Sequence, residues 1–146
     1  MLVCGLIDQC LRFAMWHTLP NRAAAEKLFA DRSVLYNFSA KIAMAHALNL
    51  FGDQTRRNLD TIRQIRKFFA HEIAALSFAT PQIVQACGEL VLPTRYRPFF
   101  MKPIRIDTPR DRYVSIGFVI VMTVFTNSLG TMWEGESAEV RPVPLP

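Results

Sequence analysis

The sequence predicts an all-α protein, a compact bundle of about six helices with one long connection rich in proline and basic residues. Three observations lead to this prediction. Apolar residues recur at helical spacing along most of the chain, the alternation typical of strands is scarce, and turn signals separate the periodic stretches. The chain has 146 residues, 51% hydrophobic and 20% charged, which is enough for one domain with a substantial core.

Two helices are expected at the start of the chain, separated by Leu19-Pro20-Asn21. Their apolar stripes are Val3, Ile7, Cys10, Leu11 and Ala14 in the first, and Ala24, Ala25, Leu28 and Phe29 in the second. No capping residue precedes the first helix, so we expect the natural element to begin upstream of Met1.

Three further helices are expected in the middle of the chain. The third covers about 38–50, with Asn37 or Ser39 as its N-cap. The fourth is long and covers 53–76, with Asp53 as its cap. Its expected buried stripe consists of Leu59, Ile62, Ile65, Phe69, Ile73 and Leu76. The fifth opens at Thr80-Pro81, because proline is favoured at the first helical position, and ends at 92–93.

The connection from 93 to 112 differs in character, because its prolines exclude regular structure. Its basic residues outnumber its two acidic ones, and they are Arg95, Arg97, Lys102, Arg105, Arg110 and Arg112. The aromatic residues between them are Tyr96, Phe99 and Phe100. Such a segment can bind phosphates and stack on unpaired bases, or it can lie on the core with its aromatic side chains inward.

A last helix is expected to start at Asp107-Thr108-Pro109 and to run into the uncharged segment 113–133. Only 114–125 is strongly apolar, which favours a buried core helix over a membrane span of about 20 apolar residues. We therefore expect one helical domain over 1–133 and a flexible, proline-rich tail over 134–146, with no membrane partner.

Composition excludes several classes of function. Seventeen Lys and Arg residues against twelve Asp and Glu give a net charge of +5, which permits contact with nucleic acid without requiring it. Cys4, Cys10 and Cys87 fit neither a disulfide framework nor a zinc site, which suits the reducing cytoplasm. The three histidines, His17, His46 and His71, are too scattered for zinc, so we expect neither a metal nor a cofactor.

The fourth helix carries the most informative pattern. At about 100° per residue, Arg66 falls within the apolar arc, between Ile73 and Leu59. A guanidinium in a dry core must be met by a carboxylate, backbone carbonyls, a partner chain or a bound anion, unless it extends from the edge of the stripe into solvent. The polar residues form a separate stripe, which consists of Arg56, Asp60, Arg63, Lys67 and His71.

Arg66 and His71 are five positions apart, about 140° around an ideal helix. They converge only if the long arginine bends around the helix or if the helix meets a second copy of itself. A symmetric homodimer would bring two arginines and two histidines into one cleft. We therefore expect a homodimer.

The segments 38–45, 47–50 and 59–71, with Phe78 and Cys87 beyond, resemble the mannitol operon repressor family of bacteria. The likeness covers roughly residues 10–92, and the block 59–71 is its specific part. That family is similar to the HEPN superfamily, whose signature is an arginine, a polar residue, three variable positions and a histidine, here Arg66 to His71. The resemblance implies a HEPN-like helical bundle.

Two positions depart from the family pattern. Asn49 stands where the family usually has glycine, and asparagine tolerates the same left-handed helix cap. Lys67 stands where the family usually has asparagine, which changes the polar neighbour of Arg66.

The resemblance implies two alternative functions. Mannitol repressors are transcription-linked regulators that lack a standard DNA-reading motif and act through partners, such as a transcription factor or nucleic acid. Active HEPN proteins are metal-independent ribonucleases, in which His71 would act as general acid or base and Arg66 would stabilise the charge on the attacked phosphate. We expect the regulator, because Lys67 departs from the usual asparagine and the named relatives are regulators. The candidate binding residues for RNA, DNA or a protein are Arg63, Lys67, Arg95, Arg97 and Lys102.

A helix-turn-helix is the remaining alternative, since 38–50, a turn at 51–53 and a helix with Arg56 and Arg57 imitate that motif. We expect this likeness to be accidental, because the fourth helix devotes a continuous stripe to packing and leaves only its first arginines free.

Overall fold

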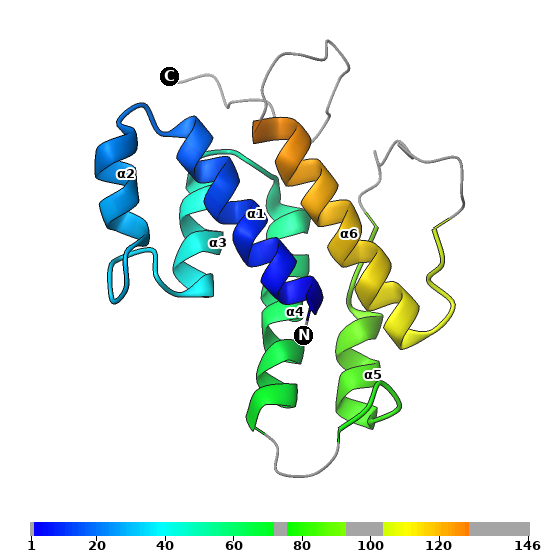
Figure 1. Ribbon diagram of the computed structural model, residues 1–146. Helices are drawn as coiled ribbons and strands as arrows, with labels where there is room; N and C mark the ends of the chain where they lie inside the picture. The colour runs from blue at the N-terminus through cyan, green and yellow to red at the C-terminus, as the bar shows by residue number, and fades with distance from the viewer. Residues whose placement is uncertain (1, 72–75, 93–103, 129–146) are drawn as a thin grey trace.

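The computed structural model describes residues 2–71, 76–92 and 104–128, and within these ranges it contains six α-helices and no strand (Figure 1). The helices are α1 (Leu2–Thr18), α2 (Arg22–Phe29), α3 (Phe38–Ala47), α4 (Asp53–His71), α5 (Pro81–Gly88) and α6 (Pro109–Ser128). The prediction of an all-α bundle is confirmed. Residues 93–103 of the basic connection and the tail 134–146 lie outside the described residues.

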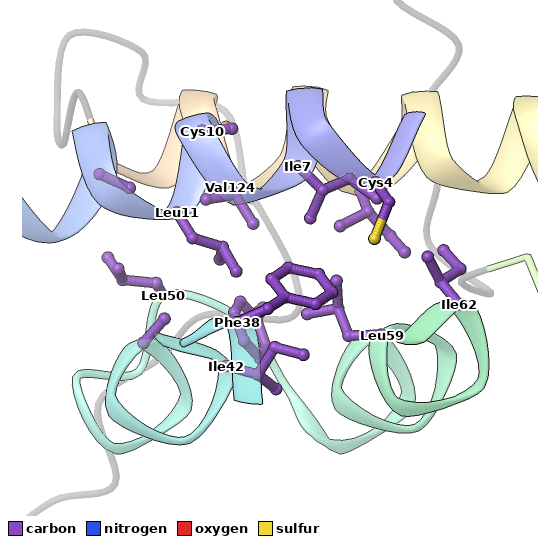
Figure 2. Packing of buried hydrophobic residues seen from close by; sticks show 14 of the residues in the cluster. Cys4, Ile7, Cys10, Leu11, Phe38, Ile42, Leu50, Leu59, Ile62 and Val124 are labelled. Carbon is purple, nitrogen blue, oxygen red and sulfur yellow. The ribbon is translucent and has the colours of Figure 1, made fainter. Parts of the chain in front are cut away.

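The helices form two layers with the core between them. Figure 2 shows α1 and α6 in one layer and α3 and α4 in the other. The side chains that meet between the layers include Ile7 and Leu11 from α1, Ile42 from α3, Leu59 from α4 and Val124 from α6, all of them at most 1% exposed. Helix α5 lies beside α4 and α6, and α2 packs against α1 (Figure 1).

Helices α1 and α6 run parallel and in close contact. The Cys10 thiol donates a hydrogen bond to the Val121 carbonyl, with 3.5 Å between sulfur and oxygen. At the carboxyl ends of the two helices, the Phe13 and Phe125 rings stack with their centroids 5.6 Å apart. Gly117 permits this approach, because a Cβ atom there would collide with the side chain of Val3.

Side chains cap several helix starts. Asn37 is the N-cap of α3, as one of the two candidates predicted, and its Oδ1 accepts a hydrogen bond of 2.8 Å from the Ala40 amide. The predicted start of α6 is confirmed as well, with the Thr108 hydroxyl accepting from the Asp111 amide at 3.1 Å. The predicted start of α5 is confirmed, with Thr80 as its N-cap and Pro81 in its first turn, although the Thr80 side chain forms no capping hydrogen bond. The predicted cap of α4 is wrong, because the helix begins at Asp53 itself, whose carboxylate lies 3.1 Å from His46 Nε2.

Three helices are shorter than the sequence predicts. Helix α3 ends at Ala47, because Asn49 takes up the left-handed conformation expected of it, with φ of 55°. Helix α4 is helical through His71, and Leu76 lies beyond it, whereas Ile73 is outside the described residues.

Helix α5 ends at Gly88 because the following backbone pairs with α4. The Asn58 amide group donates to the Val91 carbonyl at 2.7 Å, and its oxygen accepts from the Val91 amide at 3.1 Å. Both bonds are formed by a side chain that is only 1% exposed. The residues after α5 are therefore held against α4 by these two bonds instead of continuing the helix.

Helix α6 buries one side, which includes Tyr113, Ile116, Val119, Ile120 and Val124. It thus packs as a core helix, as predicted. Among the described residues, no helix combines the length and apolarity that crossing a membrane requires.

Candidate functional site

Helix α4 has two different halves. Its buried residues, Thr55, Asn58, Leu59, Ile62 and Ile65, follow one another at helical spacing in the first two thirds of the helix. No residue from position 66 to 71 is buried. In Figure 1 the last turns of α4 extend beyond the first residues of α1, so the layer that covers the helix ends before the helix does.

Arg66 is exposed, and the expectation that apolar neighbours enclose it is wrong. Its angular position on the helix is as calculated, within the arc of the buried stripe, but it lies beyond Ile65, the last buried residue of the helix, where its side chain is exposed. The guanidinium lies beside the buried Cys4 thiol at the start of α1 and near Tyr113. Of the arrangements that the sequence allowed for Arg66, the side chain that extends from the buried stripe into solvent fits best. No partner chain is therefore required to compensate a buried charge.

The charge of Arg66 acts on both of these buried groups. Burial raises the pKa of the Cys4 thiol, and the charge of Arg66 together with a hydrogen bond from it acts in the opposite direction. Burial likewise raises the pKa of Tyr113 to about 12, and Arg66 again opposes the shift. Arg66 thus lies at the surface where α1, α4 and α6 meet.

Arg63, Lys67 and His71 lie four positions apart along one exposed side of α4, as the helical angles predict. Asp60, one turn before Arg63, is held by Arg56 at 3.1 Å and lies 3.9 Å from Arg63. From position 61 to 71 the sequence has no acidic residue. Within the described residues, no carboxylate forms an ion pair with Arg66, Lys67 or His71. We call these four residues, Arg63, Arg66, Lys67 and His71, the cationic end of α4.

The cationic end is not arranged for helix stability. Like charges four positions apart, such as Arg63 and Lys67, destabilise a helix by about 0.2–0.5 kcal/mol. The partial negative charge at the helix terminus favours basic residues only within the last turn, which holds His71 alone. Arg63, Arg66 and Lys67 lie before that turn, so the helix dipole does not explain why they cluster.

Two adjacent phenylalanines near this end have different surroundings. Phe69 is half-buried, and its ring lies 5.4 Å from that of Phe78, which in turn lies 5.5 Å from Tyr113. Phe68 is 37% exposed. It was not among the predicted site residues, although its angle, about 180° from Leu59, already placed it outside the buried stripe.

The other candidates fall into two groups. Arg95, Arg97 and Lys102 lie in 93–103, outside the described residues. Arg66 and His71 are both exposed but lie on different sides of one helix, and the structure shows no contact between them. The ribonuclease arrangement therefore needs a second copy of the helix or a substrate that reaches both side chains.

The histidines and cysteines are dispersed over the bundle. The His17 ring lies 4.3 Å from the ring of Phe13, and His46 faces Asp53. Burial raises the pKa of all three thiols, that of Cys10 to about 11, which keeps them protonated near neutral pH. Among the described residues, no group of His, Cys, Asp and Glu is arranged to hold a metal ion.

The start of α4 does not favour the helix-turn-helix alternative. Thr55 and Asn58 face the core, and Arg56 is engaged by Asp60, which leaves Arg57 exposed. A recognition helix needs a free face along several turns, and this half of α4 is a packing element.

Comparison of the chain with models of protein families, with curated proteins and with solved structures finds no match. The resemblance to mannitol operon repressors and to the HEPN superfamily thus remains a prediction based on 59–71.

Proposed function

We propose that this chain is a cytoplasmic, transcription-linked regulatory protein that binds a protein or nucleic-acid partner through the cationic end of α4. The observation that carries the proposal is the exposure of Arg63, Arg66 and Lys67 on one helix segment. Within the described residues no carboxylate forms an ion pair with Arg66 or Lys67, and Arg63 has only a long contact of 3.9 Å with Asp60, which Arg56 holds at 3.1 Å. A partner that presents carboxylates or phosphates would complete their hydrogen bonds.

Phe68, which directly follows Lys67, adds an exposed aromatic side chain on the same turn of the helix. Aromatic and arginine side chains are the residues that most often dominate the free energy of binding. On nucleic acid the same ring would stack on an unpaired base. The proposal needs no catalysis and agrees with the regulator that the resemblance implies.

The test is capture of partners from a native bacterial lysate, with wild-type chain and the double variant Arg63→Gln, Lys67→Gln. Wild type should retain an identifiable transcription factor or nucleic acid and release it as salt is raised, because the contact is ionic. The double variant should retain at least tenfold less. Arg57→Gln is the matched control, since it removes an exposed cation from the other half of the same helix.

Two results would contradict the proposal. One is a wild-type chain that retains neither class of partner at low salt. The other is equal loss of the partner in the control and in the double variant, which would indicate a general effect of net charge.

The metal-independent ribonuclease is the second candidate, because Arg66 and His71 are both accessible to a substrate. His71 would take the proton of the ribose 2′-hydroxyl as its oxygen attacks the adjacent phosphorus, and Arg66 would stabilise the negative charge that develops there. The P–O5′ bond would then break, so that one RNA fragment keeps a 2′,3′-cyclic phosphate and the other leaves as a 5′-hydroxyl that takes up a proton. Cleavage of RNA in EDTA by wild type, lost in His71→Ala and in Arg66→Ala with the fold intact, would support this activity. Intact RNA after long incubation with wild type would exclude it.

A further inference from the structure

The outer side of the layer formed by α1 and α6 carries six large apolar side chains that are at least 39% exposed. They are Leu2, Leu6 and Phe13 on α1, and Val114, Phe118 and Phe125 on α6. We call them the α1/α6 face. It points away from α3 and α4, which form the opposite layer in Figure 2.

The two helices carry the same spacing. In each helix the second apolar residue lies four positions after the first, and the third lies eleven positions after the first. On an ideal helix this spacing places all three within about 40° of one another. Because α1 and α6 are parallel and Phe13 stacks on Phe125, the two stripes lie level and side by side. The result is a continuous apolar surface two helices wide.

Charge on α6 is confined to its first turn, where the exposed Arg110 lies four positions before Val114. From position 113 to the end of α6 the sequence has no charged residue. The charges of α1 are directed elsewhere, since both oxygens of Asp8 lie 2.8 Å from Lys41 Nζ on α3 and Arg12 lies over the Phe29 ring on α2. An apolar surface with a charge only at its end resembles a protein interface, in which charged residues are depleted at the centre.

The size of the face matches one side of a homodimer. The six side chains are between 39% and 91% exposed. Together they present on the order of 500 Å² of accessible apolar surface. A stable dimer buries about 800 Å² per partner, of which about 65% is apolar in homodimers. The face thus supplies about the apolar area that a two-fold interface needs.

We propose that two copies of this chain associate through the α1/α6 face about a two-fold axis. The α1 and α6 helices of both copies then form the centre of the dimer, and the two α4 helices lie in its outermost layers. This arrangement is independent of the proposed function, and it leaves both cationic ends accessible. It also keeps the two Arg66 side chains apart, unlike a dimer built around a shared Arg66 and His71 cleft.

Sedimentation velocity of the full chain over a range of concentrations tests the proposal. Wild type should be a dimer, and Leu6→Glu should raise the dissociation constant about a hundredfold, because each interface would bury two carboxylates. Val34→Glu is the matched control: it makes the same change at an apolar residue that is 73% exposed in the turn between α2 and α3, and it should remain dimeric.

Leu2→Glu is a second variant that keeps the test decisive if Leu6→Glu does not fold. Leu2 is 91% exposed, and an acidic residue in the first turn of a helix is favoured by the helix dipole. It too should weaken the dimer. Helical circular dichroism and thermal unfolding confirm that each variant is folded.

A monomeric wild type would overturn the proposal, because the face would then be covered by something other than a second copy. If that monomer binds vesicles of phosphatidylcholine and phosphatidylserine, a lipid surface covers the face. If it does not, residues 129–146 of the same chain are the remaining candidate. A wild-type dimer that Leu6→Glu and Leu2→Glu leave unchanged would overturn it as well, because the interface would then lie elsewhere.

Discussion

The cationic end of α4 and the α1/α6 face belong to opposite layers of the bundle, and they differ in chemistry. The first collects Arg63, Arg66 and Lys67 beside a single acidic neighbour on the helix, Asp60, and the second consists of apolar side chains, with no charged residue on α6 from position 113 onward. The net charge of +5 is thus distributed unevenly, and the two surfaces suit different kinds of partner. One small domain can in this way offer a surface for ionic binding and a surface for self-association without competition between them.

The strongest effect on stability is expected where α1 and α6 touch. Gly117→Ala should lower the free energy of unfolding by about 1–3 kcal/mol, because its Cβ atom would displace Val3 and separate the two helices. Urea unfolding followed by circular dichroism measures this change.

Gly88→Ala is the control for that prediction, because a Cβ atom at the end of α5 meets nothing within 4 Å. It should leave stability unchanged or raise it by up to about 1 kcal/mol. If Gly117→Ala were as mild as this control, the close packing of the α1/α6 layer would be contradicted.

Alkaline pH is expected to weaken the same layer. Burial raises the pKa of Cys10 from 9.0 to about 11 in the folded chain. The folded state therefore holds this proton more tightly than the unfolded state, so stability is fully present below pH 9 and falls as pH rises toward 11. The loss should be on the order of 2 kcal/mol.

Urea unfolding at several pH values between about 8 and 11 measures the contribution of this thiol. Cys10→Ala removes it and should flatten the decline relative to wild type. Equal slopes for the two proteins would show that the decline arises from other groups.

The smallest stability effect is expected at the cationic end of α4. Arg63→Gln with Lys67→Gln removes a repulsive pair and one long contact with Asp60, so the free energy of unfolding should change by less than about 0.5 kcal/mol. Thermal unfolding at low salt checks this value. A loss well above that range would mean that these residues support the fold, which would remove the argument that they serve binding.

Local patterns predicted the parts of the fold that depend on neighbours in sequence. The break at Pro20, the cap at Asn37 and the shared side of Arg63, Lys67 and His71 all follow from spacing along one segment. These features need no knowledge of the tertiary structure.

Features that depend on distant segments were missed. The end of α5 is set by the contact of Asn58 with Val91, 33 positions away. The exposure of Arg66 depends on where the first residues of α1 lie relative to α4, and no pattern within α4 can reveal this. Helix α6 has apolar residues on both sides, so its sequence indicated a core helix and did not distinguish the buried side from the exposed one.

Capture from a native lysate by Leu6→Glu and by Arg63→Gln with Lys67→Gln, side by side with wild type, tests the division between the two surfaces most directly. The account predicts that Leu6→Glu retains the transcription factor or nucleic acid bound by wild type, whereas the double variant loses it. Loss in Leu6→Glu with retention in the double variant would contradict the account, because the partner would then bind the apolar face.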